Sequence, residues 1–206
     1  TGKTTAYHLD EGADFTKSTP EWSKVAMGAH KIGALSVVTH EALEDIFIDL
    51  EGWVRDDFGR AFARLEEEDF TTGNGTKKPR GFMLDATVGV TAAAATAITA
   101  DELIDLQHAL AQQYRSKAVF VVSDEVIKAV RKLKTTDGQY IWQPGLQAGQ
   151  PATLLGKQVL TSEFMDAPTA GKKPVAYGDF SAYRILDRRG LFFQRLSELY
   201  ATSGQV

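Results

Sequence analysis

The glycine-rich stretch "FTTGNGTKKPRGF", residues 70–82, holds the residue types in this sequence that most suggest phosphate chemistry. A phosphate-binding P-loop reads G-x-x-x-x-G-K-[ST] and lies after a strand and before a helix, whose amides point at the phosphates. Here Gly73 and Gly75 follow a long helical pattern, and Pro79 disfavours a new helix at Lys78. Because this order is reversed, we interpret the stretch as a structural turn.

A second pattern with chemical potential is "HEALE", which begins at His40 and Glu41. It lacks the second histidine of the zinc-protease pattern H-E-x-x-H, and no third ligand is signalled. The sequence contains no cysteine, so it has neither a thiolate nucleophile nor a disulfide framework. A hydrolase or nucleotide-binding enzyme that uses His40 and Glu41 or the glycine turn is the alternative from the class of enzymes. We expect instead no catalytic residue, no metal and no cofactor.

The bulk composition fits a globular protein with a real core. The chain has 206 residues, 43% of them hydrophobic and 24% charged, with a net charge of -4. A dedicated nucleic-acid binder usually carries a marked basic excess, which this chain lacks. No apolar run approaches the roughly 20 residues that span a bilayer, so we expect no membrane partner.

The element pattern predicts an α+β fold. Residues 1–38 suggest two extended segments around a polar tip, with too few apolar residues to fold alone. Thr39 is a plausible N-cap for a helix over about 40–70, because apolar residues then recur every three or four positions. Further helices are predicted over 101–114 and over 124–133, where Ser123 is the cap. Strands are predicted over the following ranges: 118–122, 157–162, 174–179, 182–188 and 191–196.

The predicted long helix is strongly acidic. Residues 40–70 contain eleven acidic residues and three arginines, so the rest of the chain is net positive. Glu66, Glu67 and Glu68 lie at the C-terminal end, where the helix dipole favours cations. Either Lys77, Lys78 and Arg80 fold back to compensate, or a cation-rich partner does, or the cluster is a solvated face. Trp22, Trp53 and Trp142 are interpreted as packing anchors.

Several segments, taken in order, resemble one family. "KIGALSVVTHEALED", the acidic helix, "TGNGTKKPRGF", "DGQYIWQP", "PATLLGKQVLTSEFM" and "GDFSAYRILDRRG" follow the order seen in tailed-bacteriophage major capsid proteins of the Hong Kong 97 type. The resemblance covers nearly the whole chain. It implies a Hong Kong 97-type capsid fold, with an E-loop hairpin at 1–38 and a P domain with a long spine helix at 39–90. An A domain is implied at 91–180, with strands returning to the P domain at 181–206.

The resemblance also implies a function. The chain would be a structural subunit that self-assembles through pentamers and hexamers into an icosahedral shell enclosing DNA, built in the bacterial cytoplasm and ending in the virion. Its partners would be other copies of itself, a scaffold or protease during maturation, and packaged double-stranded DNA bound without sequence preference. An encapsulin-type nanocompartment shell of the same fold is the nearest alternative. The resemblance further implies an N-terminal arm before residue 1 and a last strand after Val206.

Subunit contacts are expected where the chain cannot satisfy itself. The hairpin would bury its apolar residues on another subunit, and charged residues around the end of the long helix would meet complementary charge. The expected contact residues are Tyr7, Phe15, Trp22, Glu66, Glu67, Glu68, Lys77, Lys78 and Arg80.

Overall fold

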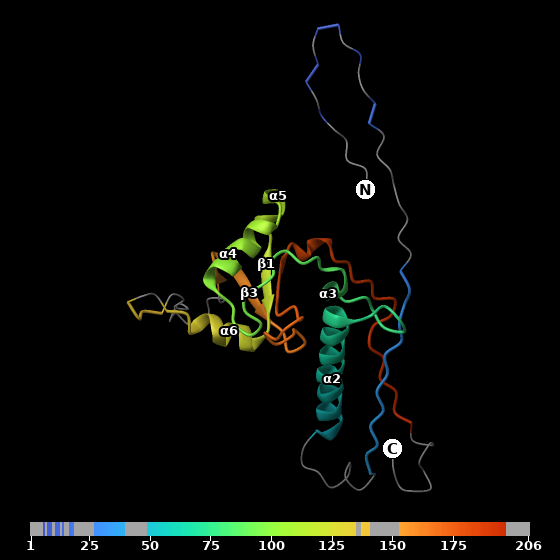
Figure 1. The fold of residues 1–206 in the computed structure, drawn as a ribbon. Coiled ribbons are helices and arrows are strands. Elements are labelled where there is room, and N and C mark those ends of the chain that lie inside the picture. The colour runs from blue at the N-terminus through green and yellow to red at the C-terminus, as the bar shows by residue number, and fades with distance from the viewer. Residues whose placement is uncertain are drawn as a thin grey trace.

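The computed structural model describes residues 6, 8–9, 11–12, 14, 17–18, 27–39, 49–134, 137–140 and 153–196. It has a mixed α and β architecture, as the sequence predicts (Figure 1). The helices are α2 Leu50–Thr72, α3 Phe82–Asp85, α4 Ala100–Ala109, α5 Gln112–Arg115 and α6 Asp124–Arg131, with the 3-10 turn η1 Phe180–Ala182. The strands are β1 Val119–Val122, β2 Thr153–Leu154, β3 Lys157–Thr161 and β4 Val175–Gly178.

The four strands form one sheet in the order β2-β3-β1-β4. The central strand β1 is parallel to β3, with Phe120 opposite Val159, and antiparallel to β4, with Phe120 opposite Tyr177. A continuous apolar run is typical of a strand covered on both faces. Three of the four residues of β1 are buried accordingly.

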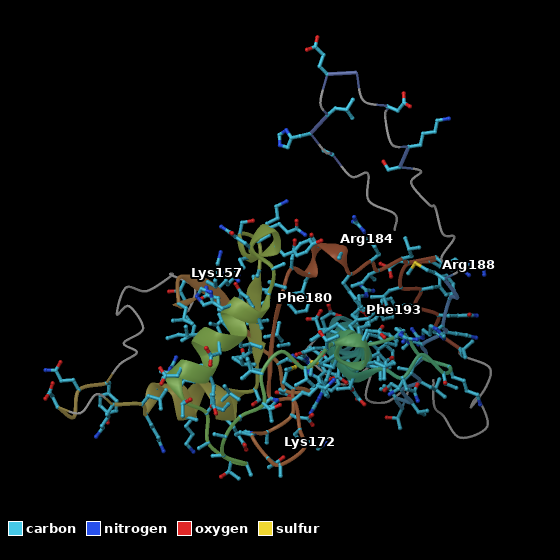
Figure 2. The ribbon with its side chains drawn as sticks, turned by 45° about the horizontal axis from the view of Figure 1, so that its top comes forward. Lys157, Lys172, Phe180, Arg184, Arg188 and Phe193 are labelled. Carbon is cyan, nitrogen blue, oxygen red and sulfur yellow. The ribbon has the colours of Figure 1, made fainter. Side chains whose placement is uncertain are left out.

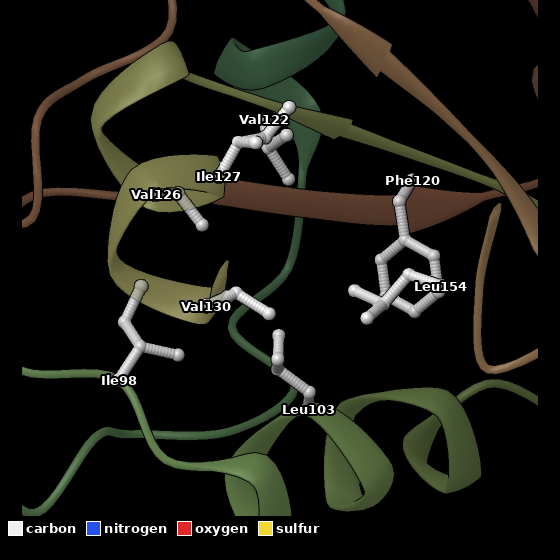
Figure 3. Packing of buried hydrophobic residues seen from close by; sticks show 8 residues of the cluster. All are labelled: Ile98, Leu103, Phe120, Val122, Val126, Ile127, Val130 and Leu154. Atoms are coloured by element: carbon white, nitrogen blue, oxygen red, sulfur yellow. The ribbon is translucent and has the colours of Figure 1, made fainter. Parts of the chain in front are cut away.

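The hydrophobic core lies between this sheet and the helices α4 and α6 (Figure 3). Phe120 from β1 and Leu154 from β2 face Leu103 of α4, while α6 presents an apolar face from the other end of the sheet. Phe120 and Tyr177 also pack ring against ring, with centroids 4.4 Å apart. The buried cluster consists of Ile98, Leu103, Phe120, Val122, Val126, Ile127, Val130 and Leu154.

The long acidic helix is shorter than the sequence predicted. The prediction of one helix over 40–70 with Thr39 as its cap is wrong, because Asp49 has ψ 83° and is the N-cap of α2, whose 23 residues end at Thr72. The Asp49 carboxylate accepts the Gly52 N–H at 2.9 Å, so this side chain competes with continued helix at that point. Residues 40–48, which include His40 and Glu41, lie outside the described part.

The predicted helix over 101–114 is two helices. Leu110 and Ala111 both have ψ near 135–139°, which separates α4 from α5. Arg115 stabilises this break, because its guanidinium donates to the carbonyl oxygens of Leu110 at 2.6 Å and His108 at 2.7 Å. The carbonyls at the end of α4 are thus satisfied by a side chain rather than by more helix.

The predicted strands over 182–188 and 191–196 are not strands in the structure. Residues 183–196 are extended but join no ladder within the described chain. Trp53 is also not the packing anchor that the sequence suggested, since it is 55% exposed on α2. The remaining strand predictions are confirmed to within one or two residues, as is the helix that follows Ser123.

Candidate subunit interface

Three segments far apart in the sequence lie side by side at one side of the molecule. Residues 27–39 and 183–196 run as extended chains beside α2, while the sheet lies on the opposite side of that helix (Figure 1). Together residues 27–38, α2 and residues 182–196 enclose an open groove of about 2040 Å³, called here the α2 groove. The apolar periodicity of α2 places Val54, Phe58 and Phe62 along it.

Aromatic stacking packs the extended residues 183–196 against α2. The ring of Phe58 lies 6.0 Å from that of Phe193 with an interplanar angle of 13°, and 6.4 Å from that of Phe62. Figure 2 shows Phe193 beside α2, and Arg184 and Arg188 further along the same segment. Such ring pairs stabilise by about 0.5–1.5 kcal/mol beyond area burial.

Much of the apolar surface of the two extended segments has no cover. Leu35 is 65% exposed, Leu186 70% and Phe192 69%. Single exposed apolar residues are ordinary, whereas a contiguous group of them marks a binding surface. The large apolar residues exposed on these segments are Met27, Leu35, Val37, Ile185, Leu186, Leu191, Phe192, Phe193 and Leu196.

The glycine turn after α2 is a structural turn, as predicted from its sequence. Gly73 caps α2 by donating its N–H to the Asp69 carbonyl at 2.9 Å, and Asn74 and Arg80 form an antiparallel bridge. The Gly81 N–H then returns to the Gly73 carbonyl at 2.8 Å. One expectation needs correction: a helix does follow the turn, but α3 is a single turn of four residues.

Two of the contact residues predicted in this turn, Lys78 and Arg80, form ion pairs within the chain. Lys78 Nζ lies 3.6 Å from Oδ1 of the buried Asp69, so one cation does fold back onto the acidic helix end. Arg80 instead forms a two-pronged pair with Asp85, at 2.7 Å from Nε and 2.5 Å from Nη2. These bonds lower the pKa of Asp85 and raise that of Arg80.

The acidic cluster is left facing outward. In the described part of the chain, Glu66, Glu67 and Glu68 have no ion pair. Glu66 lines the α2 groove, and Glu68 lines a second hollow of about 320 Å³ together with Lys77 and Lys78. Lys77 is exposed and has φ 60°.

The three apolar contact residues expected in the hairpin, Tyr7, Phe15 and Trp22, lie outside the described residues. The described residues between 6 and 18 lie well away from the sheet and α2 (Figure 1), and those residues are exposed. Sequence reasoning missed the apolar residues over 185–196, because strand-like patterns there were assigned to the chain's own sheet.

Over the described ranges, no group of three or more His, Cys, Asp or Glu residues could hold a metal ion. No helix among those described is long and apolar enough to cross a membrane. The surface features that stand out are the α2 groove and the uncovered segments beside it.

Comparisons with known proteins lead to capsid proteins. The phage capsid family matches over residues 1–206. A chain from the capsid of a native GTA particle, computed with C5 symmetry, is similar with a TM-score of 0.72 and 31% identity, over 86% of this chain and 65% of that one. The capsid chain of an empty GTA particle gives 0.69 and 30%, over 87% and 66%.

This chain thus spans just under two thirds of the length of those capsid chains. No curated protein matches the sequence. A family match over all residues and two capsid chains with a similar fold lead to the same identification. The chain belongs to the phage capsid family.

Proposed function

We propose that this chain is a subunit that self-assembles into a closed icosahedral shell. The observation that carries the proposal is the uncovered apolar surface of residues 27–38 and 185–196 beside the α2 groove. Fully burying one large apolar side chain stabilises by about 1.5–3 kcal/mol. Neighbouring copies that cover this surface would supply the free energy of assembly.

The Hong Kong 97-type organisation is part of the same proposal. Residues 1–38 are assigned to the E-loop hairpin, 39–90 to the P domain, 91–180 to the A domain and 181–206 to the return to the P domain. In support, α2 and the sheet are distinct parts of the molecule, and the chain passes between them at 86–99 and again at 179–183. The spine helix in this proposal is α2, Leu50–Thr72.

Pentamers and hexamers are the proposed assembly units, with DNA inside the shell. The similar capsid chains come from particles computed with C5 symmetry, which supports five-fold contacts. A scaffold or protease acting during maturation and sequence-independent contacts to DNA complete the proposal. Such DNA contacts would weaken as salt rises, because they release counterions.

The test is assembly of the full chain. Purified protein is examined by light scattering after gel filtration and by electron microscopy, with nuclease treatment before nucleic acid is extracted. We expect shells or capsomers of five and six copies, and nuclease-protected DNA in particles from infected or induced cells. A monomer at all concentrations would contradict self-assembly. Shells that enclose an enzyme in place of DNA would indicate a nanocompartment.

The surface itself is tested by Leu186→Ser and Phe192→Ser. Both side chains are largely exposed in the single chain, so the substitutions remove little intramolecular packing. We expect unchanged far-UV circular dichroism and thermal unfolding of the monomer, with assembly reduced at least tenfold. The matched control is Val88→Ser, which removes a side chain that is 68% exposed away from the groove.

A further inference from the structure

The turn after α2 contains the only asparagine of the sequence, Asn74, followed directly by a glycine. Asparagine can lose its side-chain amide when the backbone nitrogen of the next residue attacks the side-chain carbonyl carbon. A glycine in the next position leaves that nitrogen unhindered. Asn74 is exposed, so water has access to its amide group.

The geometry of the turn favours this attack at the carbonyl group. The Asn74 Oδ1 already accepts the Thr76 N–H at 2.9 Å, and negative charge develops on this oxygen during the attack. A preorganised N–H donor at such an oxygen is the arrangement that stabilises tetrahedral intermediates in enzymes. Lys77 follows three residues later and adds positive charge, whereas Lys78 and Arg80 are paired with Asp69 and Asp85.

The attacking nitrogen is only weakly held. The Gly75 N–H donates to the Pro79 carbonyl at 3.2 Å, at the long limit for an N–H···O bond. A side chain on residue 75 would meet only the Arg80 side chain, at 3.7 Å or more, so the surroundings of Gly75 are open. The Gly75 nitrogen is therefore held by one long hydrogen bond, while the Asn74 carbonyl oxygen accepts a shorter one.

We propose that Asn74 is a spontaneous deamidation site of the folded chain. The Gly75 nitrogen forms a bond to Cγ of Asn74, the Cγ–Nδ2 bond breaks, and ammonia leaves with the proton of the Gly75 amide. Water then opens the cyclic imide. Cleavage at Cγ gives aspartate at residue 74, and cleavage at the main-chain carbonyl gives isoaspartate. No oxidant or reductant takes part.

The two products have different consequences for the turn. An aspartate keeps an oxygen that can accept the Thr76 N–H, and its charge is three residues before Lys77 in the sequence. An isoaspartate adds a backbone carbon within the bridge between Asn74 and Arg80, which shifts the register of that bridge. The isoaspartate form should therefore loosen the connection between α2 and α3.

The experiment compares the folded protein with the synthetic peptide of residues 70–82 in the same neutral buffer at 37 °C. Mass spectrometry follows the increase in mass when the side-chain NH2 is replaced by OH. An isoaspartyl methyltransferase assay identifies the isoaspartate product. We expect the folded chain to convert at least as fast as the peptide. Slower conversion in the folded chain would overturn the proposal, because the bond from Gly75 to Pro79 would then dominate.

Two variants support the assignment. Asn74→Gln should abolish the mass gain in this segment, because attack would require a larger ring. Asn74→Asp supplies the aspartate product directly and should unfold at the same temperature as the parent chain. A mass gain of the intact chain that persists in Asn74→Gln at the same rate would place the modification at one of the chain's glutamines and refute the proposal.

Discussion

At the scale of single residues, the end of α2 depends on two glycines whose backbones are in contact. A Cβ atom on Gly81 would lie 2.5 Å from the Gly73 nitrogen and 2.6 Å from the Thr71 carbonyl oxygen. A Cβ atom on Gly73 would lie 2.2 Å from the carbonyl oxygens of Asp69 and Pro79. These neighbours are backbone atoms of a capped helix end and cannot move aside without breaking its hydrogen bonds.

Gly81→Ala should therefore destabilise the chain by about 1–3 kcal/mol, the usual cost of overpacking. The measurement is the free energy of unfolding in urea. Gly59→Ala is the matched control, because residue 59 lies inside α2 with nothing within 4 Å of the added atom. That control should stabilise by up to about 1 kcal/mol through higher helix propensity. Equal stability of Gly81→Ala and the parent chain would contradict the described turn.

Glu102 should make the free energy of unfolding depend on pH in the acidic range. Its carboxylate accepts the Thr99 N–H at 2.8 Å and the Ala93 N–H at 2.7 Å, and these bonds lower its pKa from the ordinary value of about 4.5. The stabilisation is present above that ordinary value and is lost as pH falls through the lower pKa of the folded chain. Glu102→Gln should flatten this part of the pH dependence of unfolding. A profile identical to that of the parent chain would exclude this role.

At the scale of elements, the sequence predicted what local patterns control and failed where tertiary contacts decide. The buried strand at β1 follows from its unbroken apolar run. The end of α4 at Ala109 could not be predicted, because it depends on Arg115 reaching back to two carbonyl oxygens. Asp49 is a residue type that favours a helix N-cap, so the start of α2 at Leu50 could have been predicted. The apolar periodicity continues on both sides of Asp49 and favoured one longer helix instead.

Arg115→Ala should accordingly destabilise the α4–α5 region by about 1.5–3 kcal/mol, since hydrogen bonds to a charged group are lost. Arg115→Lys should rescue only part of this loss, because an ammonium group cannot match the forked geometry. Hydrogen exchange of the α4 amides is the measurement. Arg55→Ala is the control, and its exposed pair with Glu51 contributes at most about 0.5 kcal/mol. Equal protection in both variants would contradict the role of Arg115.

At the scale of the whole molecule, a few contacts join the sheet-bearing part to the part around α2. Arg64 lies 3.4 Å from Glu163, but both side chains are more than 70% exposed, and such a pair contributes at most about 1 kcal/mol. Lys173 Nζ donates to the Ala86 carbonyl at 2.8 Å, and the rings of Phe82 and Phe180 meet edge to face with their centroids 5.0 Å apart. The fold class was predictable from sequence, as was the order of segments that resembles the capsid family. The small set of contacts between the two parts and the exposure of the apolar residues over 185–196 could be seen only in the structure.

The acidic end of α2 provides the final prediction, which rests on the proposed assembly. Changing Glu66, Glu67 and Glu68 to Lys should impair assembly far more than folding. None of the three has an ion pair within the described chain, and cations at a helix C-terminus interact favourably with its dipole. The monomer should therefore unfold at the same or a higher temperature than the parent chain.

Assembly should respond in the opposite direction, because complementary charge across subunit contacts would become repulsive. Particle yield from sedimentation and electron microscopy is compared with that of Asp56→Lys/Asp105→Lys, which reverses exposed charges outside the α2 groove. We expect loss of particles in the triple variant and normal yield in the control. Normal particles from both would identify the cluster as a solvated face, and loss in both would indicate that net charge alone controls assembly.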